Sequence, residues 1–262
     1  MTGDGTESSF ELRVTAARVL PLLDLTSLND TDNDAGIYKL CQRAVTPFGR
    51  VSAVCVWPRF VPLCRKSLND TGVRVASVIN FPHGRADQDC AMAEARAAVA
   101  YGSDEIDLVF PYTAWLNGDV KSATDLVEAC KSICGTSITL KVIIETGCFS
   151  SAVNIERASL DVIAAGADFI KTSTGKVSVN ATLEAAAVML GAIKSTGGNV
   201  GFKAAGGVRQ TAQAAAYLSI SDHLLGDGWA TADTFRFGAS GLLDDLLKHL
   251  SGGHADQPTE GY

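Results

Sequence analysis

Short apolar runs alternate with longer amphipathic segments along almost the whole chain. Short apolar runs are typical of buried strands, whereas longer segments with apolar residues three and four positions apart are typical of helices. The predicted strands are 19–25, 51–56, 73–79, 105–110, 139–145, 168–171, 200–203 and 235–238. The predicted helices are 32–44, 59–68, 86–101, 120–134, 152–165, 182–195, 211–220 and 241–250.

This alternation of eight strands with eight helices predicts a parallel sheet of the α/β class. At 262 residues the natural closure is a single (β/α)8 TIM barrel. An open doubly wound sheet is the alternative, but it usually carries a Gly-x-Gly-x-x-Gly turn after its first strand, and residues 24–29 contain no glycine. We expect residues 1–250 to form the barrel and residues 251–262, which are polar and glycine-rich, to form a flexible C-terminal tail.

The composition narrows the class of protein. With 47% hydrophobic residues, a net charge of −7 and no basic runs, the chain favours neither nucleic acid nor an anionic membrane as its partner. No apolar stretch approaches the roughly 18 residues of a membrane span, and the N-terminal residues lack an apolar signal segment. The seven cysteines form no Cys-x-x-Cys pair and the four histidines are isolated, so we expect reduced thiols, no metal site and a cytoplasmic location.

Three lysines lie within or at the end of apolar runs, where a solubilising charge is out of place. Lys171 precedes a Thr/Ser/Gly loop, Lys203 comes shortly before a double glycine, and Lys141 lies in the fifth predicted strand. They are about one βα unit apart, so each belongs to a successive strand. Lysines are rarely buried without a partner. When they are buried their pKa shifts readily, which suits them to Schiff-base chemistry.

Polar side chains occupy related positions in other predicted strands. Asp24 and Thr26 end the first, Asp107 lies in the fourth, and Glu145 ends the fifth on the same face as Lys141. Catalytic groups of a (β/α)8 barrel gather at the carboxyl ends of its strands, so we expect these groups to share the barrel mouth with the lysines.

Clustered ammonium groups repel one another, so one amine should lose its proton near neutral pH. A neutral amine can attack a carbonyl and form an iminium without a metal or other cofactor. In this interpretation Asp107 holds a second lysine charged and relays protons. The alternative is a structural ring of ion pairs that plugs the barrel.

Glycine-rich loops follow the last two predicted strands, at the usual phosphate site of such barrels. They read Gly206-Gly207-Val208-Arg209 and Gly238-Ala239-Ser240-Gly241, and a predicted helix begins at or just after each. Glycines let backbone N–H groups approach an anion at a helix N-terminus. Thr174-Gly175-Lys176, after the sixth strand, is a candidate third wall, so we expect a phosphate pocket here.

Three further residues are weaker candidates. Cys55 ends the second strand, where a packed core thiol is the main alternative to a site residue. His83 follows the third strand, where a surface or structural role is the main alternative. Tyr262, the last residue, is a candidate proton carrier if the tail reaches the barrel mouth.

From Leu23 to Tyr262 the chain resembles deoxyribose-phosphate aldolase, a class I aldolase family. The most specific similarities lie in five blocks: 80–84 (NFPHG), 104–111 (DEIDLVFP), 141–147 (KVIIETG), 169–175 (FIKTSTG) and 236–240 (RFGAS). The resemblance implies a cofactor-free (β/α)8 barrel that reversibly cleaves 2-deoxy-D-ribose 5-phosphate to D-glyceraldehyde 3-phosphate and acetaldehyde. That reaction belongs to deoxyribonucleotide and deoxyribose phosphate catabolism.

The resemblance also implies a role for each matching residue. Lys171 would form the Schiff base, Lys203 would be the second lysine that lowers its pKa, and Asp107 would be the proton-relay carboxylate. Asp24, Thr26 and Lys141 match positions of the substrate pocket, and Gly175, Lys176, Gly206, Gly207, Gly238 and Ser240 match the phosphate pocket. The expected partners are the sugar phosphate and acetaldehyde, together with a second copy of the chain in a homodimer formed through outer helix faces.

Two positions depart from the family pattern. Ala204 stands where proline is expected, which predicts a looser turn after Lys203. Gly241 stands where a serine is expected after Ser240, so one hydroxyl contact to phosphate is absent.

Two rival functions stay open: another Schiff-base or transaldolase-like enzyme with a ketone donor, and a non-catalytic sugar-phosphate-binding barrel. The lack of clustered histidines disfavours a zinc-dependent aldolase.

Overall fold

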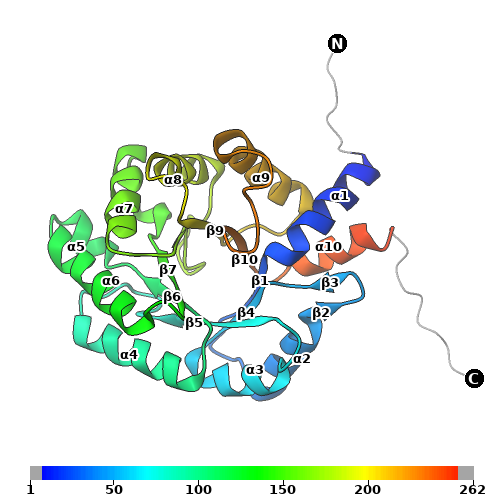
Figure 1. Cartoon of the computed structure of the whole chain (residues 1–262), viewed down its shortest axis with the longest axis horizontal. Coiled ribbons are helices and arrows are strands. Elements are labelled where there is room, and N and C mark those ends of the chain that lie inside the picture. Colours follow the sequence, from blue (N-terminus) through cyan, green and yellow to red (C-terminus); the bar gives the residue numbers. More distant parts are fainter. Residues whose placement is uncertain (1–7, 253–262) are drawn as a thin grey trace, which may run out of the picture.

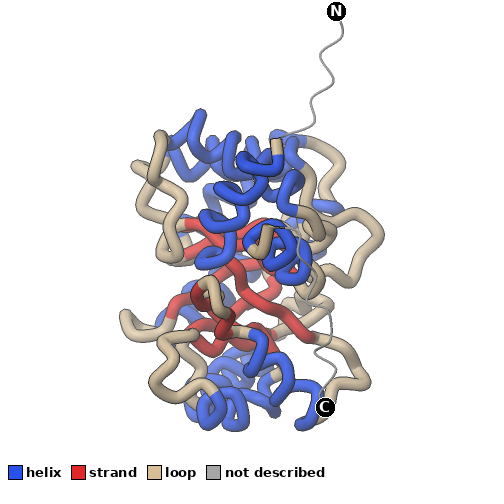
Figure 2. Tube along the Cα trace, turned by 90° about the vertical axis from the view of Figure 1, so that its right-hand side faces the viewer, coloured by secondary structure: helices blue, strands red, loops and turns tan. Residues whose placement is uncertain are grey.

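Eight parallel strands close into a barrel in the computed structural model, which describes residues 8–252 (Figure 1). Each strand pairs with the next barrel strand along the chain, and β10 pairs with β1 to complete the ring. Figure 2 shows the strands in the middle of the molecule with helices on both sides. The predicted (β/α)8 barrel is therefore confirmed, and the open doubly wound sheet is excluded.

The barrel strands are short, and most match the predicted runs to within two residues. They are β1 (Leu23–Ser27), β4 (Ala53–Val56), β5 (Arg74–Ile79), β6 (Glu105–Val109), β7 (Thr139–Ile143), β8 (Phe169–Lys171), β9 (Gly201–Ala205) and β10 (Phe235–Ala239). A two-stranded antiparallel hairpin, β2 (Val45–Thr46) and β3 (Gly49–Arg50), lies outside the barrel and was not predicted.

The helices pack around the strands. They are α1 (Ser9–Val19), α2 (Asp34–Arg43), α3 (Val61–Ser67), α4 (Gln88–Tyr101), α5 (Tyr112–Leu116), α6 (Val120–Cys134), α7 (Ala152–Ala164), α8 (Leu183–Ser195), α9 (Thr211–Leu225) and α10 (Leu242–Leu250). Short 3-10 turns occupy Leu20–Leu22, Pro58–Phe60 and Thr146–Cys148. The predicted helix 59–68 is thus divided into a 3-10 turn and α3, and the predicted helix 211–220 extends to the end of α9.

The prediction for residues 19–25 is wrong in its first half. Val19 ends the unpredicted helix α1, and Leu20–Leu22 form a 3-10 turn, so strand β1 begins only at Leu23. Buried residues at the end of a helix form the same kind of apolar run as a buried strand. Ser8 and Glu11 form a capping box at the start of α1, with each side chain accepting a hydrogen bond from the other residue's backbone N–H.

Alternation along the strands divides the buried residues into two sets. On β4, Val54 and Val56 belong to the core between barrel and helices, whereas Ala53 and Cys55 belong to a smaller cluster inside the barrel. That inner cluster continues on β5 and is apolar. The interior positions of β1, β6, β7, β8, β9 and β10 instead carry charged side chains, so the barrel interior has an apolar half and a charged half.

Gly201 is required by the packing inside the barrel. A Cβ atom at Gly201 would lie 2.4 Å from the ring of Phe169, the neighbouring residue on β8. The guanidinium carbon of Arg236 lies 5.6 Å from the centre of the same ring. Gly201 therefore makes room for the aromatic ring on which a buried cation rests.

We predict that Gly201→Ala lowers the free energy of unfolding by about 1–3 kcal/mol, because overpacking forces side chains or backbone to shift. Gly191→Ala is the matched control: Gly191 lies in α8, and a Cβ atom there would have nothing within 4 Å. This control should raise the free energy of unfolding by about 0.5–1 kcal/mol, because glycine weakens a helix interior. Urea unfolding measures both, and equal effects at the two positions would contradict the packing argument.

Candidate active site

Charged residues on neighbouring strands are aligned by the register of the barrel. Lys171 on β8 pairs with Lys203 on β9, and Lys203 pairs with Arg236 on β10. Asp107 on β6 pairs with Lys141 on β7. Paired residues of neighbouring parallel strands point to the same side of a sheet, so these side chains converge inside the barrel.

Asp107 is the common acceptor of the three lysines. One of its carboxylate oxygens accepts hydrogen bonds from Lys171 at 2.7 Å and Lys203 at 2.8 Å, and the other accepts from Lys141 at 3.0 Å. Burial by itself would raise the pKa of Asp107, but the surrounding ammonium groups of Lys141, Lys171 and Lys203 hold that pKa well below its usual range. The predicted grouping of Asp107 with these lysines is confirmed by the geometry.

Two further carboxylates and one guanidinium complete this arrangement. Asp24 accepts a hydrogen bond from Lys203 at 2.5 Å, and Glu105 accepts one from Lys141. Arg236 donates to Asp24 at 2.7 Å and to Glu105 at 2.8 and 3.1 Å. We refer to the seven groups together as the ion cluster: Asp24, Glu105, Asp107, Lys141, Lys171, Lys203 and Arg236.

Glu105 and Arg236 were not among the predicted site residues, although alternation along the strands contains the signal. Glu105 lies two residues before Asp107 on β6, and Arg236 lies two residues before Gly238 on β10. Period-2 alternation places each on the same face as a predicted site residue. Gly238 has a further part, since a Cβ atom there would lie 2.9 Å from the side chain of Lys203.

The lysines of the ion cluster differ in their electrostatic surroundings. Burial lowers the pKa of Lys171, and the positive charge of the neighbouring Lys203 lowers it further. Asp107 opposes this shift without reversing it. Burial also disfavours the charged form of Lys203, but Asp107 and Asp24 more than compensate and raise its pKa. Lys141 likewise has a raised pKa because Asp107 and Glu105 outweigh the effect of burial. Lys171 is therefore the lysine of the cluster most ready to give up its proton.

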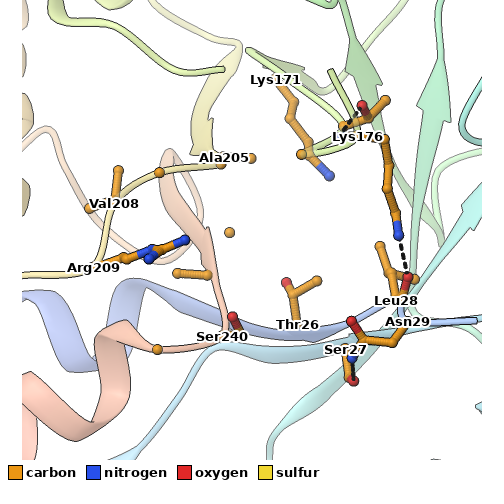
Figure 3. Close-up of a pocket in the computed structure, with 17 residues that line it drawn as sticks. Thr26, Ser27, Leu28, Asn29, Lys171, Lys176, Ala205, Val208, Arg209 and Ser240 are labelled. Carbon is orange, nitrogen blue, oxygen red and sulfur yellow. Dashed lines mark hydrogen bonds between the residues drawn. The ribbon is translucent and has the colours of Figure 1, made fainter. Parts of the chain in front are cut away.

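Lys171 is also the member of the cluster that reaches open space. It lines a cavity of about 240 Å³ at the carboxyl ends of β1, β8, β9 and β10, whereas the other six cluster residues do not. Figure 3 shows its ammonium group directed toward the centre of this cavity. A ligand in the cavity thus meets one amine of the ion cluster, and the other charges of the cluster lie beneath it.

The other walls of the cavity come from the predicted loops. Gly206 and Gly207 have φ angles of 84° and 91°, in the left-handed region that favours glycine, and Gly175 has a φ of 83°. Gly238, Ser240 and Thr26 also line the cavity, and Figure 3 shows Ser240 and Thr26 across it from Lys171. Apart from Thr26, which donates a hydrogen bond to the Asp24 carbonyl at 2.9 Å, these are the positions predicted for a phosphate pocket.

Helix α10 begins at this cavity without a side-chain cap. Gly241 is its N-cap residue, lines the cavity and makes no capping hydrogen bond. The first backbone N–H groups of a helix have no partner within the helix and attract anions. The position that departs from the family pattern therefore lies directly at the predicted phosphate site.

Two basic residues stand at the cavity edge. Lys176 donates a hydrogen bond from its ammonium group to the carbonyl of Leu28 at 2.8 Å, joining the loop after β8 to the loop after β1 (Figure 3). Arg209 extends into the cavity from the loop after β9 (Figure 3). The sequence predicts Lys176 at this site. Arg209 lies in a predicted glycine-rich loop but is not among the predicted site residues, although its place just before a helix is a usable signal.

Glu145 does not continue β7 as predicted. The strand ends at Ile143, and Glu145 has a φ of 62°, uncommon for a residue with a side chain. Its carboxylate accepts hydrogen bonds from the hydroxyl of Thr174 at 2.5 Å and from the backbone N–H of Thr174 at 3.2 Å. Burial raises the pKa of Glu145, partly opposed by these bonds. Glu145 therefore supports the loop that carries Thr174, Gly175 and Lys176.

The remaining candidates have different outcomes. Cys55 is fully buried in the inner apolar cluster, and burial raises its pKa to about 11, as expected for a packed thiol. His83 is exposed and does not line the cavity. Ala204 lies within β9 and pairs with Phe237, so the looser turn predicted after Lys203 is wrong. Tyr262 lies outside the described residues.

Among residues 8–252 no group of three or more histidine, cysteine or acidic side chains is arranged to hold a metal ion. In the same part of the chain, no helix is both long enough and apolar enough to cross a membrane.

We predict that Asp107→Asn lowers the free energy of unfolding by about 3–5 kcal/mol, because removing one partner of a buried ion pair leaves charges without compensation. Asp244→Asn is the matched control, since Asp244 forms an ion pair with Arg43 at the surface. Exposed pairs contribute little, so this control should leave stability nearly unchanged. Urea unfolding of both variants measures the difference, and a small effect of Asp107→Asn would show that the ion cluster does not depend on that carboxylate.

Comparisons with known proteins agree with this geometry. A solved structure from Toxoplasma gondii ME49, described as a provisional deoxyribose-phosphate aldolase, has a TM-score of 0.84 at 26% identity and covers 93% of this chain and 98% of its own. A structure from Coccidioides immitis, also described as a provisional deoxyribose-phosphate aldolase, has a TM-score of 0.78 at 27% identity. It covers 89% of this chain and 86% of its own. A protein described as QR15, an aldolase, has a TM-score of 0.75 at 28% identity and covers 89% of this chain and 98% of its own.

The sequence profile of the DeoC/LacD family aldolases matches residues 18–245. That range begins near the end of α1 and ends within α10, so it contains every strand of the barrel and every residue of the ion cluster. The chain belongs to the DeoC/LacD family of aldolases.

Proposed function

We propose that this chain is a class I deoxyribose-phosphate aldolase, a carbon–carbon lyase. In this proposal it reversibly cleaves 2-deoxy-D-ribose 5-phosphate to D-glyceraldehyde 3-phosphate and acetaldehyde through a Schiff base on Lys171. The observation that carries the proposal is that Lys171 alone joins the buried ion cluster to the cavity, while its pKa is lowered. The family match and the similarity to the Toxoplasma protein support the choice of substrate.

The first steps need a neutral amine. In the proposed mechanism the Lys171 nitrogen attacks C1 of the open-chain sugar phosphate and forms a carbinolamine. Loss of water then gives an iminium, which withdraws electrons from the C2–C3 bond. The lowered pKa of Lys171 increases the share of neutral amine at a given pH, and the charged Lys203 beside it opposes reprotonation.

Bond cleavage requires removal of the proton from the 3-hydroxyl group. As that proton leaves, the C3–O bond becomes a carbonyl, the C2–C3 electron pair moves toward the iminium, and glyceraldehyde 3-phosphate departs. Because its pKa is held low, Asp107 is a poor final acceptor for this proton, so it relays the proton through a water molecule. Protonation of the enamine at C2 and hydrolysis of the resulting iminium release acetaldehyde and restore Lys171.

The phosphate group would lie between the glycine loops. Backbone N–H groups near Gly206, Gly207 and Gly241, together with the cations Lys176 and Arg209, form a local anion site in a chain whose net charge is −7. The proposed reaction belongs to the breakdown of deoxyribose phosphates. The expected homodimer and cytoplasmic location stay predictions.

We predict that sodium borohydride with acetaldehyde, in the presence of EDTA, attaches a two-carbon adduct to Lys171. Reduction of the iminium makes this bond permanent, and peptide mass mapping locates it. Lys171→Met should remove the adduct and abolish turnover, because no other lysine of the ion cluster lines the cavity. Lys121→Met is the control, since Lys121 is an exposed residue of α6.

Each alternative has its own outcome in this experiment. Absence of an adduct on folded wild-type protein would contradict the Schiff-base mechanism and favour a sugar-phosphate-binding barrel. Reaction with a ketone donor but not with acetaldehyde would favour a transaldolase-like enzyme. Substantial turnover by Lys171→Met would contradict the assignment of this residue.

We also predict that Gly241→Ser increases the preference for phosphorylated over non-phosphorylated substrate by about tenfold or more. A hydrogen bond to a charged group is worth roughly 1.5–3 kcal/mol, and about 1.4 kcal/mol corresponds to a factor of ten. The backbone accepts a side chain here, because Gly241 has a φ of −91° and a Cβ atom would have nothing within 4 Å.

The measurement is kcat/KM for 2-deoxy-D-ribose 5-phosphate and for 2-deoxy-D-ribose in both proteins. Gly226→Ser is a suitable control, since Gly226 follows α9 outside the cavity. Serine is strained at the φ of 97° found there, so this control protein will be less stable than the wild type. An unchanged ratio of the two kcat/KM values in Gly241→Ser would refute the predicted phosphate contact.

A further inference from the structure

Arg236 is fully buried beneath the cavity and does not line it. Its guanidinium group donates to both oxygens of Glu105 and to one oxygen of Asp24. Through these carboxylates it is linked to Lys141 and Lys203, each of which is bonded to Asp107 beside Lys171. The polar contacts that link Arg236 to Lys171 therefore pass through the other members of the ion cluster.

The ion cluster has more basic groups than acidic ones. Contacts connect four bases, Lys141, Lys171, Lys203 and Arg236, with three carboxylates, Asp24, Glu105 and Asp107. An uncompensated charge in the interior is costly, so the cluster is most stable when one base is neutral. Arginine does not lose its proton in proteins, so the neutral base must be a lysine.

The contacts decide which lysine this is. Lys203 donates to two carboxylates, Asp24 and Asp107, and Lys141 donates to Glu105 and Asp107. Lys171 donates to Asp107 alone. The lysine with the fewest carboxylate partners gains least from being charged, and it is the one at the cavity.

We propose that Arg236 is a positioning residue that, together with Glu105, sets the charge of the ion cluster so that Lys171 is left as its neutral member. The guanidinium supplies a permanent charge to Asp24 and Glu105, and these carboxylates then need less compensation from the lysines. This inference rests on the proposed function of Lys171, because it explains how that amine is kept ready for attack.

Four charged or titratable groups outside the ion cluster lie near Lys171. Lys176 and Arg209 line the cavity beside it, and their positive charges favour its neutral form. Glu145 follows β7 and bonds to Thr174, and within residues 8–252 it forms no ion pair. Its negative charge favours the charged form of Lys171, but burial raises the pKa of Glu145 and so weakens this effect. Cys55 on β4 has its pKa raised to about 11 by burial and stays neutral. The facing residues of β5, Ala76 and Val78, are apolar.

Arg74 also contacts Glu105, at 3.3 Å, from the start of β5, where the amino-terminal end of the barrel meets solvent. Its side chain is 41% exposed and pairs with Asp233 at 2.7 Å, so it has its own counter-ion and is screened by solvent. Arg74 is therefore the matched control. It is an arginine that contacts the same carboxylate, Glu105, but it is partly exposed and has its own counter-ion, so it does not change the net charge of the ion cluster.

The charge balance predicts opposite effects of two substitutions. Arg236→Met leaves three lysines facing three carboxylates, so Lys171 retains its proton and titrates at higher pH by about one unit or more. Glu105→Gln removes a carboxylate, so Lys171 titrates at lower pH. The double variant Arg236→Met/Glu105→Gln removes one charge of each sign and should return the titration of Lys171 close to that of the wild type.

The measurement is competitive labelling with a trace of acetic anhydride over a range of pH, with fragmentation of the peptide that contains Lys171. This gives the pKa of Lys171 without any turnover. The acid limb of kcat/KM against pH should move in the same direction in each variant, and Arg74→Met should move neither.

Unchanged titration in both single variants, shifts of the same sign, or an equal shift in Arg74→Met would overturn the proposal. If Arg236→Met does not fold, Glu105→Gln and the balanced double variant still test it, because the expected downward shift and its reversal do not need the single arginine variant. The wild-type borohydride experiment stands apart: a missing adduct would refute the Schiff base, while the titration shifts would still report on the cluster.

Discussion

A single carboxylate, Asp107, accepts hydrogen bonds from three lysine ammonium groups inside the barrel, and the charged half of the interior is arranged around it. Buried charges are tolerable only when they are paired and hydrogen-bonded. Asp24, Glu105 and Arg236 satisfy the lysine and carboxylate groups that Asp107 alone would leave without partners. Lys171, the amine that the proposed reaction uses, is the lysine with the fewest carboxylate partners.

The groups that would bind the substrate and the groups that act on Lys171 lie at different depths in the barrel. In the proposed mechanism, charged side chains buried under the cavity set the protonation of Lys171, whereas the cavity itself is lined mainly by glycine loops and hydroxyl groups. This separation explains how an acidic protein can receive an anionic substrate. The net charge of −7 is a property of the whole chain, while the cavity presents backbone N–H groups, Lys176 and Arg209.

Much of this arrangement could be predicted from the sequence, because strand periodicity is local information. The three lysines and Asp107 lie on buried strands, and the glycine loops come at the ends of such strands. Parallel strands bring these positions together inside a barrel and at one end of it. Arg236 and Glu105 obey the same alternation, but local sequence does not distinguish a charged residue near the start of a buried strand from one at the surface. Their role emerges only once strands far apart in the chain are paired.

Other features depended on tertiary context. Helix α1 was missed although Ser8 and Glu11 form a capping box, because its apolar end merged with the run that leads into β1. Glu145 was placed on the strand because the apolar pattern continues through Ile144. Its left-handed backbone and its bonds to Thr174 depend on a loop that comes almost thirty residues later. Local propensity carries no information about such a contact.

The ion cluster draws its members from six of the eight strands, and two that touch, Asp24 and Arg236, are separated by 212 positions along the chain. A partly closed barrel would bury some of these charges without their partners, and each unpaired charge would raise its free energy. States with five or six strands in place are therefore disfavoured relative to both the open chain and the completed ring. The same charges that we propose keep Lys171 neutral thus make closure of the barrel cooperative.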